Sequence, residues 1–191
     1  PLERGERAVD RIDQLVSELL TLARQGSGID EPTEFDLEGV VRDAWATAGS
    51  GDATLVVGAD ARVRADRGRL RQALENLFRN AVEHACEADA DLTVVVSATD
   101  EGVLVADDGS GIDPAHREDA FEPGFTTTPD GTGYGLDIVR EIVESHGWTV
   151  ELRPDAALPL PLEVPRPDGA CFVIEAPGPD AVPETEPWID G

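Results

Sequence analysis

The sequence predicts an α+β fold, in which short strands build a sheet and amphipathic helices are segregated from it. Two observations indicate this fold. Apolar residues recur at helical spacing in a few long segments, which is typical of helices that bury one face. Short runs rich in valine and leucine, bounded by glycine, proline and aspartate, are typical of strands. A mixture of this kind favours one sheet with separate helices.

The first expected element is a helix at residues 2–25, with one apolar face and one charged face. Its apolar residues follow 3-4-3-4 spacing: Val9, Ile12, Val16, Leu19 and Ala23. Such a face needs a partner, which is either the rest of its own domain or, as we favour, another helix of a dimerisation bundle. Gly26, Ser27 and Gly28 end the helix and open a short linker.

The remaining elements are short strands and three further helices. Strands are expected at 33–37, 54–57, 62–65, 92–98, 103–106, 148–152 and 171–175, with 92–98 and 103–106 forming a hairpin-like pair. Helices are expected at 38–48, 67–86 and 133–146. Residues 107–132 are rich in glycine, proline and threonine, and residues 154–168 and 177–191 look irregular. We therefore divide the chain into a partial bundle helix (1–28), one domain (29–176) and a tail (177–191).

The charge of the chain excludes several classes of partner. Its 191 residues include 40 acidic and 15 basic ones, for a formal net charge of −25, and every basic residue is arginine. This charge argues against binding to nucleic acid or to anionic membranes. At molar salt the Debye length falls to about 3 Å and the self-repulsion is largely screened. We therefore expect a halophilic protein from a salty cytoplasm; a merely acidic domain is the alternative.

Cysteine content and hydropathy suggest a cytoplasmic location. The two cysteines, Cys86 and Cys171, are too few for a disulfide framework, so a reducing interior is expected. No apolar run approaches the roughly 20 residues that a membrane-spanning helix requires, so we expect no membrane insertion by this chain. No signal peptide opens the sequence, and its start at Pro1 suggests a fragment of a longer protein.

The first segment with chemical content is 74–84 on the long helix. Asn76, Asn80 and His84 recur every four residues and therefore lie along one face, beside the buried stripe. Asparagine costs up to about 0.7 kcal/mol relative to alanine inside a helix. Two asparagines on one face of this helix therefore suggest a functional role. A carboxamide oxygen can hold Mg²⁺, which prefers oxygen ligands. A solvated helix face would explain the same residues if the segment stood alone.

The second segment, Asp107-Asp108-Gly109-Ser110-Gly111-Ile112, directly follows an expected strand. An aspartate at a strand end can accept a hydrogen bond from an exocyclic amine such as that of adenine. Gly109 and Gly111 let the backbone turn sharply and approach a flat ring. Alone, an Asp-x-Gly-x-Gly pattern is more often a plain turn.

The third segment, Gly131-Thr132-Gly133-Tyr134-Gly135-Leu136, opens an amphipathic helix. Free N–H groups and the positive end of the helix dipole favour an anion at such a place. The glycines superficially fit a dinucleotide-binding fingerprint, but no strand directly precedes them, which disfavours that interpretation.

Taken in order, the three segments resemble the histidine-kinase branch of the gyrase/Hsp90/kinase/MutL ATPase superfamily, over about residues 33–176. Asn80 matches the magnesium-binding asparagine of the N box. Asp107, Gly109 and Gly111 resemble the G1 box, with Asp107 at the adenine-reading position. Residues 121–127 look like the F box of the ATP lid, and 131–136 like the G2 box.

The resemblance implies a two-layer sandwich of one mixed sheet and three helices, with ATP between the helix layer and the lid. It implies ATP and Mg²⁺ as cofactors and Asn80 as the metal ligand. The residues that it implies for nucleotide binding are Asn76, Asn80, His84, Asp107, Gly109, Gly111, Ile112, Gly131, Thr132, Gly133, Tyr134, Gly135 and Leu136. The implied partners are a response regulator and the first helix of a dimerisation domain, which carries the acceptor histidine in a homodimeric full-length protein.

The chain departs from the family pattern at the phosphates and at the acceptor. Glu83 stands where relatives often carry a lysine, and the sequence has no lysine. Phosphate charge must then be met by Mg²⁺, by backbone amides near 133–136 or by an arginine, with Arg79 as the first candidate for a catalytic role beside Asn80 and Arg117 in the lid as the second. A solvated surface arginine is the alternative for both. None of the three histidines has the setting of a phosphoacceptor, so we expect the acceptor to be supplied by another part of a longer protein.

Three reaction classes compete. A histidine kinase transfers the γ-phosphoryl group by positioning and charge neutralisation, whereas an ATP-hydrolysing clamp of the gyrase or MutL kind uses a glutamate one turn before the magnesium asparagine. That place is Asn76, which cannot act as a base, and Glu75 points about 100° away around the helix. This favours the kinase and ranks serine kinases of the anti-sigma type lower. An ATP-sensing module or pseudokinase scaffold is the third class.

Overall fold

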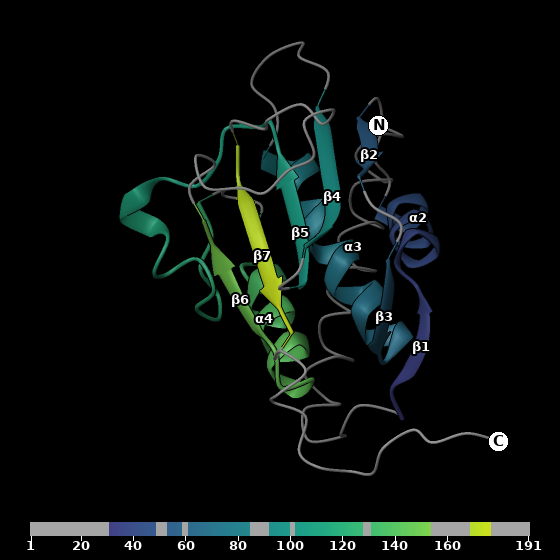
Figure 1. Ribbon diagram of the computed structural model, residues 1–191. Coiled ribbons are helices and arrows are strands. Elements are labelled where there is room, and N and C mark those ends of the chain that lie inside the picture. The colour runs from purple at the N-terminus through teal and green to yellow at the C-terminus, as the bar shows by residue number, and fades with distance from the viewer. Residues whose placement is uncertain are drawn as a thin grey trace, which may run out of the picture.

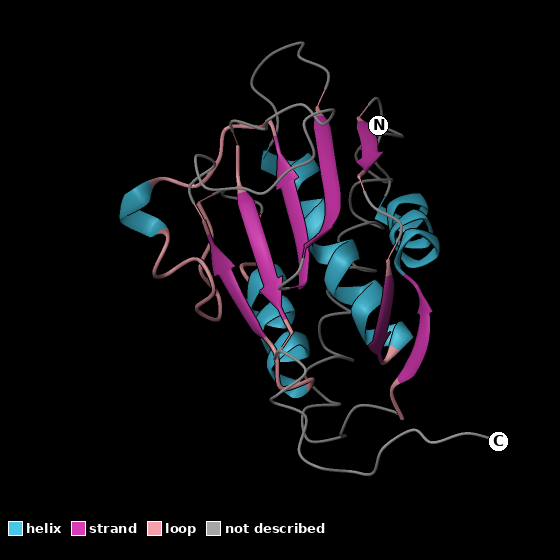
Figure 2. Cartoon of the chain, viewed as in Figure 1, coloured by secondary structure: helices cyan, strands magenta, loops and turns pink. Residues whose placement is uncertain are grey.

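The computed structural model describes residues 31–48, 53–58, 61–84, 92–99, 102–127, 131–153 and 169–176. Within these ranges the fold is α+β, as predicted: a five-stranded mixed sheet carries helices on one face (Figures 1 and 2). The helix expected at 2–25 and the tail at 177–191 lie outside the described residues. Among the helices that the structure describes, none is both long enough and apolar enough to cross a membrane.

The elements follow the expected order closely. The strands are β1 (Thr33–Asp36), β2 (Thr54–Val57), β3 (Arg62–Ala65), β4 (Thr93–Thr99), β5 (Gly102–Asp107), β6 (Thr149–Leu152) and β7 (Cys171–Glu175). The helices are α2 (Leu37–Ala48), α3 (Arg67–His84) and α4 (Gly135–Ser145), with a short 3₁₀ helix η1 (Pro114–His116) between β5 and α4. In Figure 2, η1 stands out to one side of the sheet.

The main sheet has the order β2-β4-β5-β7-β6. β2 pairs with β4 in parallel, which requires a crossover, and the chain makes it through β3 and α3. The other neighbours are antiparallel, and β5 pairs with β7 although they are far apart in the sequence. The carboxyl end of β5, at Asp107, therefore lies beside the start of β7.

β1 and β3 form a separate antiparallel pair, which the expectation of one sheet did not include. β3 alternates exposed arginines with less exposed Val63 and Ala65, and exposed Arg62 pairs with Glu34 of β1 at 3.1 Å. A ribbon with one polar face suits the surface of the molecule, whereas β4 and β5 are buried on both faces. β1 and β3 therefore form a small ribbon of their own, with one face toward solvent.

The core lies between the helices and one face of the main sheet. Alternate residues of the central strands point into it, among them Val94 and Val96 of β4 and Phe172 of β7. Phe78 of α3 is fully buried and packs edge-on against Trp45 of α2, with ring centroids 5.2 Å apart. Burying a side chain of this size contributes roughly 1.5–3 kcal/mol. This packing fixes α3, and with it the face that carries the two asparagines.

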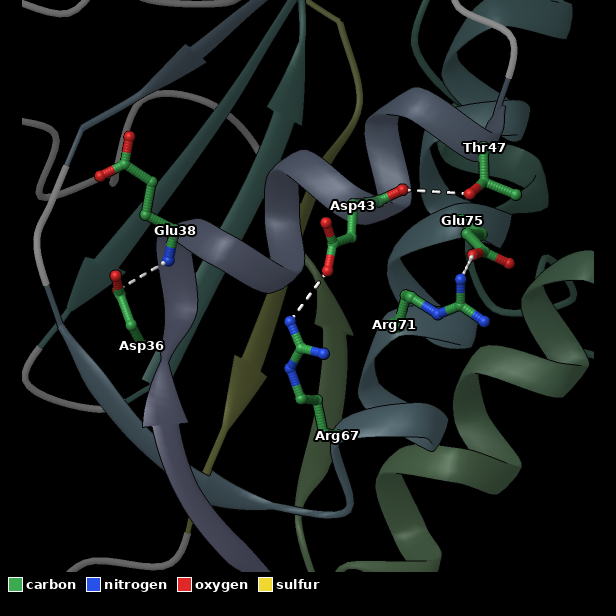
Figure 3. Close-up of polar contacts among 7 residues, drawn as sticks. All are labelled: Asp36, Glu38, Asp43, Thr47, Arg67, Arg71 and Glu75. Carbon is green, nitrogen blue, oxygen red and sulfur yellow. Dashed lines mark hydrogen bonds and ion pairs between the residues drawn. The ribbon is translucent and has the colours of Figure 1, made fainter.

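Polar contacts set the start of α2 and its alignment with α3 (Figure 3). The Glu38 amide donates to Asp36 Oδ1 over 3.1 Å at the start of α2. Arg67, at the start of α3, pairs with Asp43 of α2 at 2.8 Å between Nη2 and Oδ2. Both side chains of this pair are half exposed, so it aligns the helices more than it stabilises them.

A second link joins the start of α3 to the end of α4. Asp66 caps α3, since its Oδ1 accepts from the Arg69 amide over 3.0 Å. The amide of Asp66 donates to His146 Nε2 over 3.1 Å, while His146 Nδ1 lies 2.7 Å from the Ile142 carbonyl oxygen. Both bonds form together when the imidazole carries its proton on Nδ1. The two helices that carry the N-box and G2-box residues are thus tied at one end.

Candidate functional site

The three motif segments, far apart in the sequence, line one pocket of about 570 Å³. α3 forms one wall, the end of β5 and the following loop form the floor, and the segment 113–127 and the start of α4 close the other side. Twelve of the residues expected at the site line it: Asn76, Arg79, Asn80, His84, Asp107, Gly111, Ile112, Gly131, Thr132, Gly133, Gly135 and Leu136. Gly109 and Tyr134, also expected there, lie outside the lining.

The α3 wall carries the amide and basic groups of the site. Asn76 is 7% exposed, and its Nδ2 donates to the Gln72 carbonyl oxygen over 2.9 Å. That bond directs Oδ1 toward Gly135 at the start of α4, where a Cβ would lie 3.9 Å from it. Arg79 and Asn80 line the pocket beyond Asn76. α3 thus contributes two carboxamide side chains and one guanidinium side chain to the lining of the pocket.

Asp107 lies at the floor and is 6% exposed. Its Oδ1 accepts from the Gly109 amide over 3.0 Å and from the Ala170 amide over 3.2 Å. Burial raises the pKa of the Asp107 carboxyl, an effect that these two amide bonds and His84 oppose and that neighbouring Asp108 reinforces. Since both amides bind Oδ1, Oδ2 keeps its capacity to accept from an amine in the pocket.

Residues 169 and 170 are a part of the site that the sequence did not indicate. The Gly169 amide donates to the Asp107 carbonyl oxygen over 2.9 Å, and Ala170 both binds the Asp107 carboxylate and lines the pocket. A Cβ on Gly169 would collide with the Asp107 carboxylate. Gly169 stands two residues before β7, and a glycine near a strand can mark a close backbone approach. That signal does not say which backbone approaches, so only the β5–β7 pairing identifies the partner.

The two G1-box glycines have different roles. Gly111 lines the pocket with φ at 68°, a left-handed conformation that favours glycine. A Cβ there would lie 3.3 Å from the Gly169 backbone. Gly109 contributes its amide to the Asp107 carboxylate instead of lining the pocket. Gly109 thus binds the Asp107 carboxylate directly. Gly111 allows the backbone at Gly169 to come close.

The segment 113–127 forms the side of the pocket opposite α3. Asp113 Oδ1 accepts from the Ala115 amide over 2.8 Å and begins η1. The rings of His116 and Phe125, both in the lining, lie 5.5 Å apart. Phe121, 5% exposed, packs edge-on against Phe172 with centroids 6.2 Å apart. This aromatic contact anchors the segment in the core.

Arg117, the second candidate for the phosphates, is outside the lining. Its Nε donates to the Ile112 carbonyl oxygen over 3.2 Å. Arg79 is therefore the candidate arginine that the structure brings to the pocket.

The glycine-rich segment turns into α4 at the pocket. Gly133 has φ at 74°, and its carbonyl oxygen accepts from the Gly124 amide over 3.0 Å. α4 begins at Gly135, which lines the pocket together with Leu136, so the positive end of the helix dipole lies at the pocket. Tyr134 packs instead against Ala73, Ile138 and Ile142 and is not among the lining residues.

Glu75, the acid next to Asn76, lies beside Thr47 of α2 (Figure 3). Its side chain is 15% exposed and lies in contact with α2 near Thr47, with Oε1 3.4 Å from Arg71 Nη1. Burial raises the pKa of the Glu75 carboxyl, opposed by Arg71, Arg79 and a hydrogen bond from Thr47. Glu75 does not line the pocket. The sequence-based expectation about its direction agrees with this placement.

The pocket offers few protein ligands to a metal. The residues described here include no cluster of three or more histidine, cysteine, aspartate or glutamate side chains that could hold an ion. Asn80 and Glu83, whose side chains carry oxygen atoms, are among the lining residues. Mg²⁺ keeps several waters and is commonly bound by one or two protein oxygens together with phosphates. The donor set fits an ion that arrives with a nucleotide, not one held by the protein alone.

Comparison with known proteins agrees with this geometry. Residues 65–180 match the family of histidine kinase-, DNA gyrase B- and HSP90-like ATPases. The sensor histidine kinase ZraS of Klebsiella oxytoca is 40% identical over 154 residues, or 76% of this chain and 33% of ZraS. The methanogenesis regulatory histidine kinase FilI of Methanothrix harundinacea is 32% identical over 156 residues, or 76% of this chain and 18% of FilI. The chain spans about a third of the ZraS proteins it matches.

Solved structures show the same fold. The catalytic domain of histidine kinase ThkA is 29% identical, with a TM-score of 0.60 over 78% of this chain and 96% of that one. Full-length ShkA, solved with AMPPNP, is 32% identical, with a TM-score of 0.66 over 90% of this chain and 36% of ShkA. The family match covers more than half of the sequence, and it includes all three motif segments. The chain therefore belongs to the histidine kinase-, DNA gyrase B- and HSP90-like ATPases, as a catalytic ATP-binding domain of the sensor-histidine-kinase kind.

Proposed function

We propose that the pocket binds Mg-ATP and that the γ-phosphoryl group passes to a histidine of a dimerisation domain, in two-component signalling. One observation carries this proposal: Asn80, Asp107 and Gly133 come from three distant segments and line the same pocket. The similarity to ShkA, whose structure contains an ATP analogue, supports a nucleotide as the occupant.

Each wall has a role in this proposal. Asp107 Oδ2 accepts a hydrogen bond from the adenine amine, and His84 lies against the base. Arg79 and the amides at the start of α4 meet the phosphate charge, while Asn80 holds the metal through its carboxamide oxygen. Mg²⁺, when bound, neutralises charge on the phosphates. Asn76, Gly111, Ile112, Gly131, Thr132, Gly135 and Leu136 complete the surface around the nucleotide.

The position of Glu75 favours phosphoryl transfer over hydrolysis. A clamp ATPase needs a base beside the attacking water, and Glu75 lies against α2 instead. Asn76, one turn before Asn80, cannot take a proton. Water bound near the γ-phosphoryl group is therefore not activated by Glu75 or Asn76, and a histidine supplied by another helix is the better nucleophile.

The acceptor in this proposal is the first helix of the dimerisation domain. Of the three histidines in the sequence, His84 and His116 line the pocket and His146 binds Asp66 and Ile142. None is offered on a separate helix to a bound nucleotide. The proposed assembly is a homodimer that acts in the cytoplasm, where ATP is available, and phosphorylates a response regulator.

We also propose a halophilic setting. The formal net charge of −25 and the absence of lysine support it. Such a chain repels itself in dilute buffer, and molar salt screens that repulsion.

The test is ATP binding with and without Mg²⁺ in molar KCl, followed by transfer of labelled phosphate to a supplied histidine-bearing dimerisation domain. Asp107→Asn should weaken ATP binding about ten- to a hundredfold, because a hydrogen bond to a charged group contributes roughly 1.5–3 kcal/mol. Asp108→Asn is the matched control, since its exposed carboxylate binds the Thr93 amide instead of facing the pocket. Asn80→Asp should alter the dependence on Mg²⁺.

Three outcomes separate the candidates. Mg²⁺-dependent binding with transfer supports the kinase. Binding without transfer to any supplied domain favours an ATP-sensing or pseudokinase scaffold. Absence of binding by a folded protein rejects the nucleotide site.

A further inference from the structure

The backbone at the start of β7 is packed against the carboxylate that we assign to adenine. The nearest atoms to a Cβ placed on Gly169 would be Asp107 Oδ1, the Asp107 carbonyl oxygen and the Gly109 amide nitrogen, the last at 2.6 Å. Real Cβ atoms do not approach other atoms this closely. Two of these atoms are backbone, and the carboxylate is buried, so none can move away at low cost.

Four hydrogen bonds hold this arrangement. Two backbone bonds join the strands: Gly169 N to Asp107 O and Asp107 N to Ala170 O, each 2.9 Å. Two more, from the Gly109 and Ala170 amides, bind Asp107 Oδ1. Within the described residues, Oδ1 accepts both amide bonds, so Oδ2 is the oxygen that can accept from a ligand.

We propose that Gly169 is a positioning residue for base selection: its missing side chain lets the clamp of two amides hold Asp107 with one oxygen turned to the exocyclic amine of the base. This inference rests on the proposed nucleotide site and adds to it the group that sets its selectivity. Any side chain at 169 would displace Oδ1 from the clamp and rotate the acceptor away from the amine.

The test compares two nucleotides that differ only in the exocyclic amine: ATP and purine riboside triphosphate. The wild-type chain should prefer ATP about ten- to a hundredfold, the size of one charge-assisted hydrogen bond. In Gly169→Ala this preference should fall close to one, while purine riboside triphosphate still binds. In an Asp107→Asn background, Gly169→Ala should add no further loss of preference, because the two residues act on one contact.

The control is Gly39→Ala, on α2, where a Cβ meets nothing within 4 Å. It should keep the wild-type preference. A Gly169→Ala variant that binds both nucleotides more weakly but keeps the preference has lost only stability, and that result overturns the proposal. If the wild-type chain binds neither nucleotide, the proposed function fails instead, which separates the two claims.

If Gly169→Ala does not fold, a measurement on the wild-type chain tests whether the two amides hold the Asp107 carboxylate while ATP is bound. Nuclear magnetic resonance couplings across hydrogen bonds can detect the pairs from the Gly109 and Ala170 amides to the Asp107 carboxylate. The proposal requires both couplings to persist when ATP binds. Their disappearance on ATP binding would show that the clamp does not hold the reading carboxylate.

Discussion

Gly124 and Gly133 lie in backbone contact at the edge of the pocket, which Gly133 lines. The Gly124 amide donates to the Gly133 carbonyl oxygen over 3.0 Å, and a Cβ on Gly133 would overlap the Gly124 backbone, 2.6 Å from its carbonyl oxygen. Both glycines have positive φ, 81° and 74°. Backbone contact therefore joins the segment that resembles the F box to the segment that resembles the G2 box.

Gly133→Ala should disrupt the contact with Gly124 and weaken ATP binding. The left-handed conformation alone costs a non-glycine residue about 1–2 kcal/mol, and the overlap with Gly124 adds to it. The measurement is ATP affinity by calorimetry together with thermal unfolding. Gly147→Ala is matched in backbone conformation, since Gly147 has φ at 73° with nothing within 4 Å of its Cβ position. It should lose stability but keep ATP affinity; equal affinity loss in both variants would contradict the role of the contact.

Asp107→Asn should raise stability at neutral pH while it weakens ATP binding. Burial raises the pKa of Asp107 in the folded state, so the folded protein holds that proton more tightly than the unfolded one. The free energy of unfolding therefore falls as pH rises from the ordinary value of 3.8 through the raised pKa, and the loss is complete above it. Asparagine removes this penalty and keeps an oxygen for the two amides. Urea unfolding at pH 7 and below pH 3.8 should show a gain only at the higher pH.

Glu75→Gln should leave background ATP hydrolysis unchanged, because Glu75 lies against α2 and outside the pocket. Burial raises the pKa of the Glu75 carboxyl in the folded state. As for Asp107, the free energy of unfolding therefore falls as pH rises through the raised pKa. Glutamine should therefore preserve or increase the free energy of unfolding at pH 7. Phosphate release measured over hours gives the decisive comparison. A large fall in hydrolysis would identify Glu75 as a base and would favour the clamp-type ATPase.

Thermal stability should rise with KCl between 0.1 and 2 M. Salt screens the repulsion between the acidic side chains, which increases the free energy of unfolding. Each additional kcal/mol raises the midpoint temperature of unfolding by about 2–4 °C for a chain of this size. Removing charge should imitate salt. Glu118→Gln combined with Asp119→Asn, at two exposed positions, should raise the low-salt midpoint and reduce the response to KCl. A midpoint that falls with added KCl would reject the halophilic proposal.

The sequence predicts best what local pattern determines. The spacing of Leu70, Leu74 and Leu77 predicts α3, and the four-residue spacing of Asn76 and Asn80 predicts that both line one wall. Strand limits also follow from alternation and turn residues. These properties depend on residues close in sequence, so one chain contains enough information for them.

Pairing between distant strands could not be predicted in the same way. Nothing local to Arg62–Ala65 indicates that it pairs with Thr33–Asp36 and leaves β2 to join β4. Gly169 belongs to the same class, because its importance depends on Asp107, more than sixty residues earlier. For Tyr134 the local motif was misleading. Its place in the glycine-rich segment predicted a contact with the nucleotide, but the side chain packs against Ile138 and Ile142 and does not line the pocket.

The pairing of β5 with β7 also orders events during biosynthesis. Asp107 acquires its amide partner at 170 only after the ribosome has released the residues of β7, long after α3 and β4 have emerged. A nascent chain that ends before β7 can collapse around its valines, but its carboxylate is not yet held in place. Because domains generally form in step with translation, nucleotide affinity should appear late and abruptly as the chain lengthens. ATP in the cell then stabilises completed chains, which can bind it, and does not stabilise chains that end before β7.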